Sequence, residues 1–259
     1  MSLYVCQLTL HDNVFFATRE MGILYETEKY LHNWALSYAL FEAKYIPKPY
    51  RLKGETAQRP GYLDIENEQN LLQLNDAGIY VFPALPLRWS YQVNTFKAAQ
   101  VNYYGKSKQF GDKGADKNYP INYGRAKELA VGSIYRTFLI TSEEVNLPKM
   151  RWIRLGKWAT KILVELEKIP DSEIQHQSGT YICNHPLNPI DLPNSTQLLL
   201  FNRIVMPPVS LVSQAQLSGD FIKIAKKRQK KDPHWSSFPR DICLPTGVQY
   251  GANVLTTAA

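Results

Sequence analysis

The chain has 259 residues, of which 30 are basic and 23 acidic, giving a formal net charge of +7 at pH 7. A hydrophobic content of 44% excludes global disorder, and no apolar run reaches the roughly 18 residues of a membrane-spanning helix. The first basic residue is Arg19, so the start lacks the charged region of a signal peptide, and three scattered cysteines fit a reducing compartment. We therefore expect one elaborated cytoplasmic domain over residues 1–259.

The first predicted element is a strand from Leu3 to Leu10. Its residues alternate between two rows, one of which is entirely apolar or aromatic and should face the core: Tyr4, Cys6, Leu8 and Leu10. From about Glu26 to Ala43 the spacing becomes helical, with one stripe formed by Leu31, Trp34, Ala35, Tyr38 and Phe41. We interpret His32, within this predicted helix, as a hydrogen-bonded core residue rather than a catalytic one.

A short buried strand is predicted at residues 78–82, and a basic, aromatic arm follows at residues 88–127. The arm contains eight basic and only two acidic residues, so it carries nearly all of the net charge. Its eight aromatic residues are interleaved with these cations, and its glycines suit a long hairpin. Cations for phosphates and rings for unpaired bases are typical of single-strand nucleic-acid binding. The alternative interpretation is a solvated insertion whose aromatic side chains pack on the parent domain.

After a predicted strand at Ile134–Thr141, the stretch from Met150 to Leu166 is the second informative region. It holds four cations before its first acid, and Trp152 and Trp158 flank its centre. Gly156 lies between two strand-like pieces and permits a close backbone approach, which is useful beside a phosphate. A single glycine with Lys157 lacks the spacing of a Walker loop.

The final third is rich in proline, with strands predicted at Gly179–Cys183 and Leu198–Val205. A second basic run from Phe221 to Lys231 is interpreted either as a helix end lying on a nucleic-acid backbone or as a solvated loop. Its candidate nucleic-acid contacts are Lys223, Lys226, Lys227 and Arg228.

Catalytic and metal-binding patterns are weak in this sequence. A zinc site would have to combine residues that lack paired CxxC or HxxxH spacing, namely Cys183, His185, His234 and Cys243. Neither a glycine-rich dinucleotide loop nor a nucleophile elbow is present. We therefore expect no catalytic residues, no metal and no cofactor.

Several stretches together resemble one protein family. They are the opening strand, Phe15–Glu20, Leu24–Leu40, Tyr80–Ala84 and Arg154–Trp158. These segments are similar to the Csc-one proteins, the Cas-five-type subunits of type I-D CRISPR surveillance (Cascade) complexes. The likeness is strongest over roughly residues 1–165, and the segment from Tyr25 to Leu40 is its most specific part.

The resemblance implies an α+β fold: a ferredoxin-like, RRM-related palm with an inserted β-hairpin thumb at 88–127 and β-rich C-terminal elaborations. It also implies a non-catalytic subunit that caps the 5′ handle of the crRNA. The partners it implies are the crRNA, a Cas-seven-type backbone subunit, a Cas-ten-like large subunit and target double-stranded DNA near the PAM, with no membrane.

We expect RNA contacts from the arm and from the bend at Arg154–Trp158, which we place beside strands of the same sheet. The candidate residues are Phe96, Lys97, Tyr103, Tyr104, Lys106, Lys108, Arg151, Arg154, Gly156, Lys157 and Trp158. The competing hypothesis is a metal-independent, crRNA-processing endoribonuclease that uses Lys29, Tyr30 and His32. Lys29 and His32 would lie on different sides of one helix, which disfavours that hypothesis. A weaker alternative is a peripheral membrane protein held by the basic arm.

Overall fold

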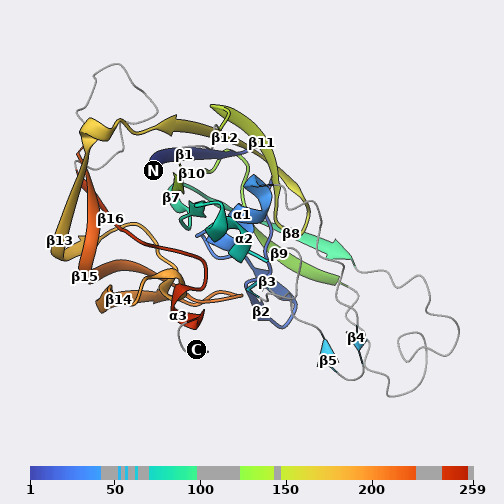
Figure 1. The fold of residues 1–259 in the computed structure, drawn as a ribbon. Helices are drawn as coiled ribbons and strands as arrows, with labels where there is room; N and C mark the ends of the chain where they lie inside the picture. Colours follow the sequence, from blue (N-terminus) through green and yellow to red (C-terminus); the bar gives the residue numbers. More distant parts are fainter. Residues whose placement is uncertain are drawn as a thin grey trace, which may run out of the picture.

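The computed structural model describes residues 1–41, 52–53, 56–57, 62–63, 70–97, 123–142, 147–225 and 241–255. Over these residues the protein is a mixed α/β structure dominated by strands (Figure 1). That composition agrees with the expected α+β class at its coarsest level. No helix among the described residues is long and apolar enough to cross a membrane.

The central sheet is antiparallel and has six strands. In spatial order it contains β11 (Met150–Leu155), β12 (Thr160–Lys168), β1 (Ser2–Leu10), β10 (Ile134–Thr141) and β6 (Tyr80–Val81), with β7 (Leu85–Arg88) also paired to β10. The predicted strand at Ile134–Thr141 is therefore confirmed, and the first predicted strand begins one residue earlier than expected.

The base of the predicted arm lies in a separate four-stranded sheet, which we call the arm sheet. Its order is β2 (Arg19–Met21), β3 (Leu24–Glu26), β9 (Tyr123–Leu129) and β8 (Tyr91–Lys97). Strands β8 and β9 pair antiparallel, so the two described ends of the arm do form a hairpin base. The expectation that the arm and the Arg154–Trp158 bend adjoin the same sheet is wrong, because that bend belongs to the central sheet.

The C-terminal sheet consists of β13 (Ile174–Cys183), β15 (Leu211–Ala225), β14 (Gln197–Ile204) and β16 (Asp241–Pro245). The remaining elements are short: β4 (Leu52–Lys53), β5 (Thr56–Ala57), α1 (Asn33–Leu40), α2 (Leu72–Asp76), α3 (Ala252–Leu255) and the 3-10 turns η1 (Asp171–Glu173) and η2 (Pro189–Asp191). Residues 221–225 continue β15, so neither the helix end nor the loop predicted for that part of the basic run is correct.

The helix predicted from Glu26 begins only at Asn33. Glu26 ends β3, and the next residues are fixed in a non-helical path by side-chain hydrogen bonds. The Thr27 hydroxyl donates to the Phe16 carbonyl at 3.1 Å and accepts from the Phe16 amide at 2.9 Å. His32 is the N-cap, and its Nδ1 accepts a hydrogen bond from the Trp34 amide.

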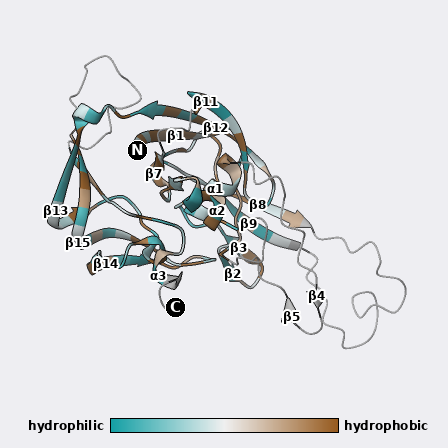
Figure 2. Ribbon diagram, in the orientation of Figure 1, coloured by the Kyte–Doolittle hydropathy of each residue, from teal (hydrophilic) through white to brown (hydrophobic). Residues whose placement is uncertain are grey.

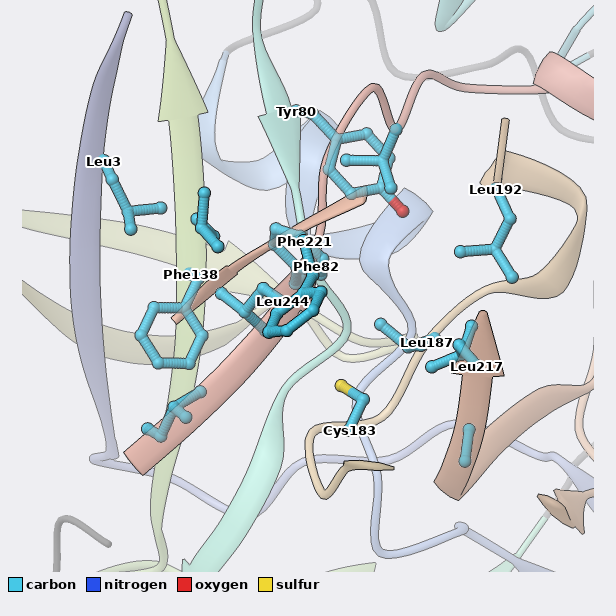
Figure 3. Close-up of a cluster of buried hydrophobic side chains, with 14 of the residues drawn as sticks. Leu3, Tyr80, Phe82, Phe138, Cys183, Leu187, Leu192, Leu217, Phe221 and Leu244 are labelled. Carbon is cyan, nitrogen blue, oxygen red and sulfur yellow. The ribbon is translucent and has the colours of Figure 1, made fainter. Parts of the chain in front are cut away.

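Both faces of β1 are buried, although only one row was predicted to face the core. Cys6, Leu8 and Leu10 pack with Leu36 and Leu40 of α1. On the opposite face, Leu3 and Val5 join a cluster with strands of the C-terminal sheet, and Figure 3 shows Leu3 and Phe138 on the same side as Phe221 and Leu244. The alternation of β1 was predicted correctly, but the residues that cover its second face belong to the C-terminal sheet, more than 170 residues away in the sequence.

Candidate nucleic-acid interface

The bend at Arg154–Trp158 is a tight turn between β11 and β12. Gly156 has φ of +79° and the Ala159 amide donates to the Gly156 carbonyl at 3.1 Å, while the Arg154 guanidinium donates to the Ala159 carbonyl at 3.2 Å. A Cβ on Gly156 would lie 2.9 Å from the Phe15 carbonyl oxygen. The close approach that this glycine permits is therefore made by the protein's own backbone, and not by a phosphate.

The turn is fastened to the segment that leaves β1. The Lys157 amide donates to the Phe15 carbonyl at 2.9 Å, and the Trp158 ring lies 4.8 Å from the Phe15 ring, centroid to centroid. Trp158 is nevertheless 47% exposed. Because its ring is anchored along one side only, Trp158 can offer aromatic surface to a ligand without losing its position.

Residues 13–15 also connect this turn to the arm sheet. Val14 forms a β-bridge with Leu129 of β9, and the Asn13 side chain donates to Gln92 of β8 at 3.2 Å. The arm base and the turn are thus joined through one linking segment, although they belong to different sheets. That the two basic regions form one RNA grip stays a prediction.

The aromatic residues of the arm base are partly engaged within the protein. Phe96 lies across Gly124, where an added Cβ would be 2.5 Å from the Phe96 ring, and its centroid is 5.7 Å from that of Tyr25. The Lys127 ammonium lies 4.4 Å from the Tyr91 ring centroid. Phe96, chosen from the sequence as a stacking residue, therefore has at least one face covered by its own sheet.

Acidic residues of β3 and its neighbourhood reduce the charge of the arm base. Lys127 forms an ion pair with Glu26 at 2.9 Å, and Arg19 pairs with Glu28 at the same distance. Burial and the nearby Glu28 and Glu26 carboxylates raise the pKa of Tyr91 to about 12, with Arg19 acting in the opposite direction. Part of the positive charge counted from the sequence is therefore balanced locally.

Several predicted contacts lie outside the described residues: Tyr103, Tyr104, Lys106, Lys108, Lys226, Lys227 and Arg228, together with the side chain of Lys97. Among the described ones, Lys223 of β15 lies 3.3 Å from the Asp241 carboxylate of β16. Arg151, Arg154, Gly156, Lys157 and Trp158 are all at β11 or its following turn. Arg154, Gly156, Lys157 and Trp158 therefore lie together at the end of β11 and in its turn. Arg151 is half-buried and points to the opposite face of the strand, the face of Ile153 and Leu155.

Three side chains that lie beside this group were not among the candidate contacts, although Trp152 was noted as flanking the centre of the stretch. Trp152 of β11 is 48% exposed, the Lys161 ammonium lies 4.1 Å from its ring centroid, and His11 contacts its edge with centroids 4.8 Å apart. The alternation of Met150, Trp152 and Arg154 on an exposed strand face was the signal that could have identified Trp152.

Comparison with known families gives a match along nearly the whole chain. Residues 1–253 match the family described as Type I-D CRISPR-associated protein Cas5/Csc1. The chain belongs to this family. The match extends well beyond residue 165, where the resemblance visible in the sequence weakened.

Two solved structures have a similar arrangement at low identity. One is the cryo-EM structure of the Type III-B Cmr-beta bound to cognate target RNA and AMPPnP. The two chains are 7% identical, the match covers 83% of this chain and 86% of the other, and the TM-score is 0.44. The other is a CRISPR protein from Archaeoglobus fulgidus; it is 12% identical, covers 86% of this chain and 95% of its own, and has a TM-score of 0.41. No curated protein matches the chain.

In this Cas5/Csc1 family member, the residues of the nuclease hypothesis are arranged differently from the expectation. Lys29 and Tyr30 precede α1, so the argument that Lys29 and His32 lie on opposite sides of one helix is wrong. The Lys29 ammonium lies 5.3 Å from the Tyr30 ring centroid. His32 is buried, with Nδ1 bonded to the Trp34 amide and Nε2 lying 3.1 Å from the Val209 carbonyl, and burial lowers its pKa to about 4.

Two of the residues considered for zinc are buried among other groups of the fold. The Cys183 thiol donates to the His185 carbonyl at 3.4 Å, and the buried His185 ring packs edge-on against Phe82 and Phe138. His234 lies outside the described residues. Within the described part of the chain, no three His, Cys, Asp or Glu side chains are grouped as metal ligands would be.

Strand β14 carries a different kind of surface. Leu199, Leu200 and Phe201 are all exposed, Leu200 at 68%, and two register shifts in the pairing with β15 surround them. Among the described strands β14 pairs only with β15, so its other edge is open there. Its single charged residue is Arg203, whose Nε donates to the Ser210 hydroxyl. This apolar edge does not have the chemistry of a polyanion site.

Proposed function

We propose that this protein is a non-catalytic RNA-binding subunit of a type I-D CRISPR Cascade complex. It caps the 5′ handle of the crRNA and helps to position the large subunit at the PAM end of target DNA. The observation that carries this proposal is the family match over residues 1–253. The exposed cations and rings near the β11–β12 turn supply the chemistry that single-stranded RNA requires.

The order of the central strands supports an RRM-related palm. Strands β12, β1, β10 and β6 lie side by side in that order, and α1 connects β1 to the strands that follow it. A ferredoxin-like β-α-β-β-α-β unit has this strand order. In chain order, strand β11 takes the position of the second helix of that unit, between β10 and β12. The hairpin base of β8 and β9 is inserted between β7 and β10, which is the place of a thumb.

The open edge of β14 supports membership of a larger protein assembly. A strand edge that exposes leucine and phenylalanine side chains is normally covered by another element or carries charged residues that prevent association. Among the described residues, the outer edge of β14 is not paired with a further strand, and the strand has one charged residue. A protein neighbour such as the Cas-seven-type backbone subunit or the Cas-ten-like large subunit suits this surface better than RNA does. The proposal therefore assigns RNA to the β11–β12 region and protein contact to the C-terminal sheet.

The first test is the salt dependence of handle-RNA binding. Changing Arg154 and Lys157 together to alanine removes two exposed cations of the turn and should lower the slope of log affinity against log salt by about 1.4, since each phosphate contact on single-stranded RNA contributes about 0.7. Arg203→Ala is the matched control, because it removes an exposed cation of the C-terminal sheet. Fluorescence anisotropy with labelled handle RNA at several salt concentrations measures both. An unchanged slope in the double variant argues against an RNA grip at the turn.

The second test concerns catalysis. The isolated protein should leave its cognate repeat RNA intact, because both His32 ring nitrogens are engaged within the fold and the imidazole is buried. Denaturing gels after long incubation with chelator check this expectation. Defined products that disappear in His32→Asn would instead support the endoribonuclease hypothesis. Asparagine is the appropriate replacement because it is also a strong N-cap residue.

A further inference from the structure

The face of the central sheet opposite α1 is divided into a covered and an open half. Paired residues of antiparallel strands point to the same face, so Leu3, Val5 and Thr9 share one face of β1 with Phe138 and Ile134 of β10. Leu3, Val5 and Phe138 lie under the C-terminal sheet (Figure 3). Thr9 and Ile134 are only partly buried, which shows that the cover ends before the far end of the strands.

The strand register places aromatic and basic side chains on the open half. Thr9 pairs with Leu163, and Leu163 pairs with Trp152, so these three residues form one row across β1, β12 and β11. The neighbouring row contains Lys161 and Arg154, which pair directly. On the far side of the sheet, Arg88 pairs with Ile134 and is exposed on the same face.

The charges on this face change along the strands. Toward the covered half, Glu165 accepts a hydrogen bond from Gln7 at 3.3 Å and pairs with Met150. Toward the open end, the charged side chains projecting from the strands are Lys161, Arg154 and Arg88. His11 continues β1 there, and Asp12 accepts a bond from the Lys161 amide. The open half is therefore cationic, with an exposed indole at its centre.

We propose that this open half is a stacking platform for single-stranded RNA, with one unpaired base on Trp152 and phosphates held by Lys161 and Arg154. The proposal rests on the proposed RNA-binding function and assigns that function a base-stacking position. The flexible four-carbon stem of Lys161 allows its ammonium to move from the indole face to a phosphate when a base takes its place. Positive charge around an exposed ring complements RNA, whereas the apolar edge of β14, with Arg203 as its single charged residue, does not.

The test uses the full chain and a fluorescein-labelled uridine 12-mer RNA, titrated by anisotropy at several salt concentrations. Trp152→Ala should weaken binding about 5- to 150-fold at every salt concentration without changing the slope. Trp152→Phe should retain most of the affinity because a stacking ring remains. Lys161→Gln should instead lower the slope by about 0.7. Phe201→Ala is the control and should leave the affinity unchanged, because Phe201 is an exposed ring of β14, where no RNA contact is assigned.

The outcomes separate this inference from the broader function. If Trp152→Ala binds like the wild type while the Arg154 and Lys157 double variant binds more weakly, the platform is wrong and the RNA-binding function stands. If the wild-type chain binds neither the uridine RNA nor the handle RNA, both are wrong. If it binds only the handle RNA, the platform for single-stranded RNA is wrong and the RNA-binding function stands. If Trp152→Ala leaves RNA affinity unchanged and impairs assembly with the partner subunits, the face is a protein contact and the inference is overturned.

Discussion

Replacing Asp191 with alanine should lower the free energy of unfolding by about 3–5 kcal/mol, because three buried donors would lose their acceptor. The Asp191 carboxylate is fully buried. Its Oδ2 accepts from the Asn33 amide group at 2.8 Å and from the Tyr80 hydroxyl at 3.1 Å. Its Oδ1 accepts from the Gly251 backbone amide at 2.9 Å. Each unsatisfied donor costs about 1–3 kcal/mol.

This effect should be large because Asp191 joins parts of the chain that are far apart in sequence. It lies in η2, and its partners come from α1, β6 and the C-terminal segment. The same junction contains the Tyr250 hydroxyl, which lies 2.6 Å from the Ser37 hydroxyl and accepts from the Val81 amide at 3.0 Å. The network therefore attaches the C-terminal segment to the central sheet, and Leu192 and Tyr80 belong to the same buried cluster (Figure 3).

Urea unfolding followed by circular dichroism measures the loss. Asp171→Ala is the matched control, because Asp171 is an exposed acid in η1 and its replacement should change stability by less than about 0.5 kcal/mol. Equal stability of the two variants would contradict the structural role assigned to Asp191.

Local sequence patterns were sufficient to predict a strand or a turn where the residues of that element alone determine its conformation. The alternation of Ile134–Thr141 gave that strand with both ends correct. The cations and tryptophans around Gly156 identified the turn, although the reason for the glycine is the carbonyl of Phe15. That contact joins two parts of the chain about 140 residues apart, and a turn pattern contains no information about such a neighbour.

The errors arose where distant side chains decide the conformation. The start of α1 is delayed because Thr27 bonds the backbone of Phe16, a choice that helical periodicity does not reveal. Figure 2 shows hydrophilic colouring along much of β13, whose exposed faces give little apolar alternation to recognise. Asp191 stands in a proline-rich stretch that reads as a loop, and its role depends on partners more than 50 residues away on either side.

The stability of the protein between pH 4 and 6.5 should be set by opposing contributions from His32 and Asp191. Burial lowers the pKa of His32 from 6.5 to about 4, so the unfolded chain binds more protons in this range. The His32 contribution is therefore full above pH 6.5 and is lost as the pH falls toward 4. Its size is about 3 kcal/mol, since one pKa unit corresponds to about 1.4 kcal/mol.

Asp191 acts in the opposite sense. Burial raises its pKa from 3.8 to about 6, against the effect of its hydrogen bonds, so the folded chain binds the extra proton. Its contribution is full below pH 3.8 and is lost as the pH rises through 6, again by about 3 kcal/mol. Burial lowers the pKa of His185 well below its usual value, which adds a second loss of stability in acid. The wild-type protein should therefore be less stable at pH 4 than at pH 6.5.

Two non-titrating variants separate these contributions. Relative to the wild type, His32→Asn should gain about 3 kcal/mol as the pH falls from 6.5 to 4, because the acid penalty of the imidazole is removed while the helix cap remains. Asp191→Asn should lose stability more steeply than the wild type over the same range, because the compensating carboxyl no longer titrates. Urea midpoints at pH 4.5, 5.5 and 6.5 give the three profiles. Parallel profiles for the wild type and His32→Asn would show that His32 titrates normally in the folded chain, which would contradict its burial.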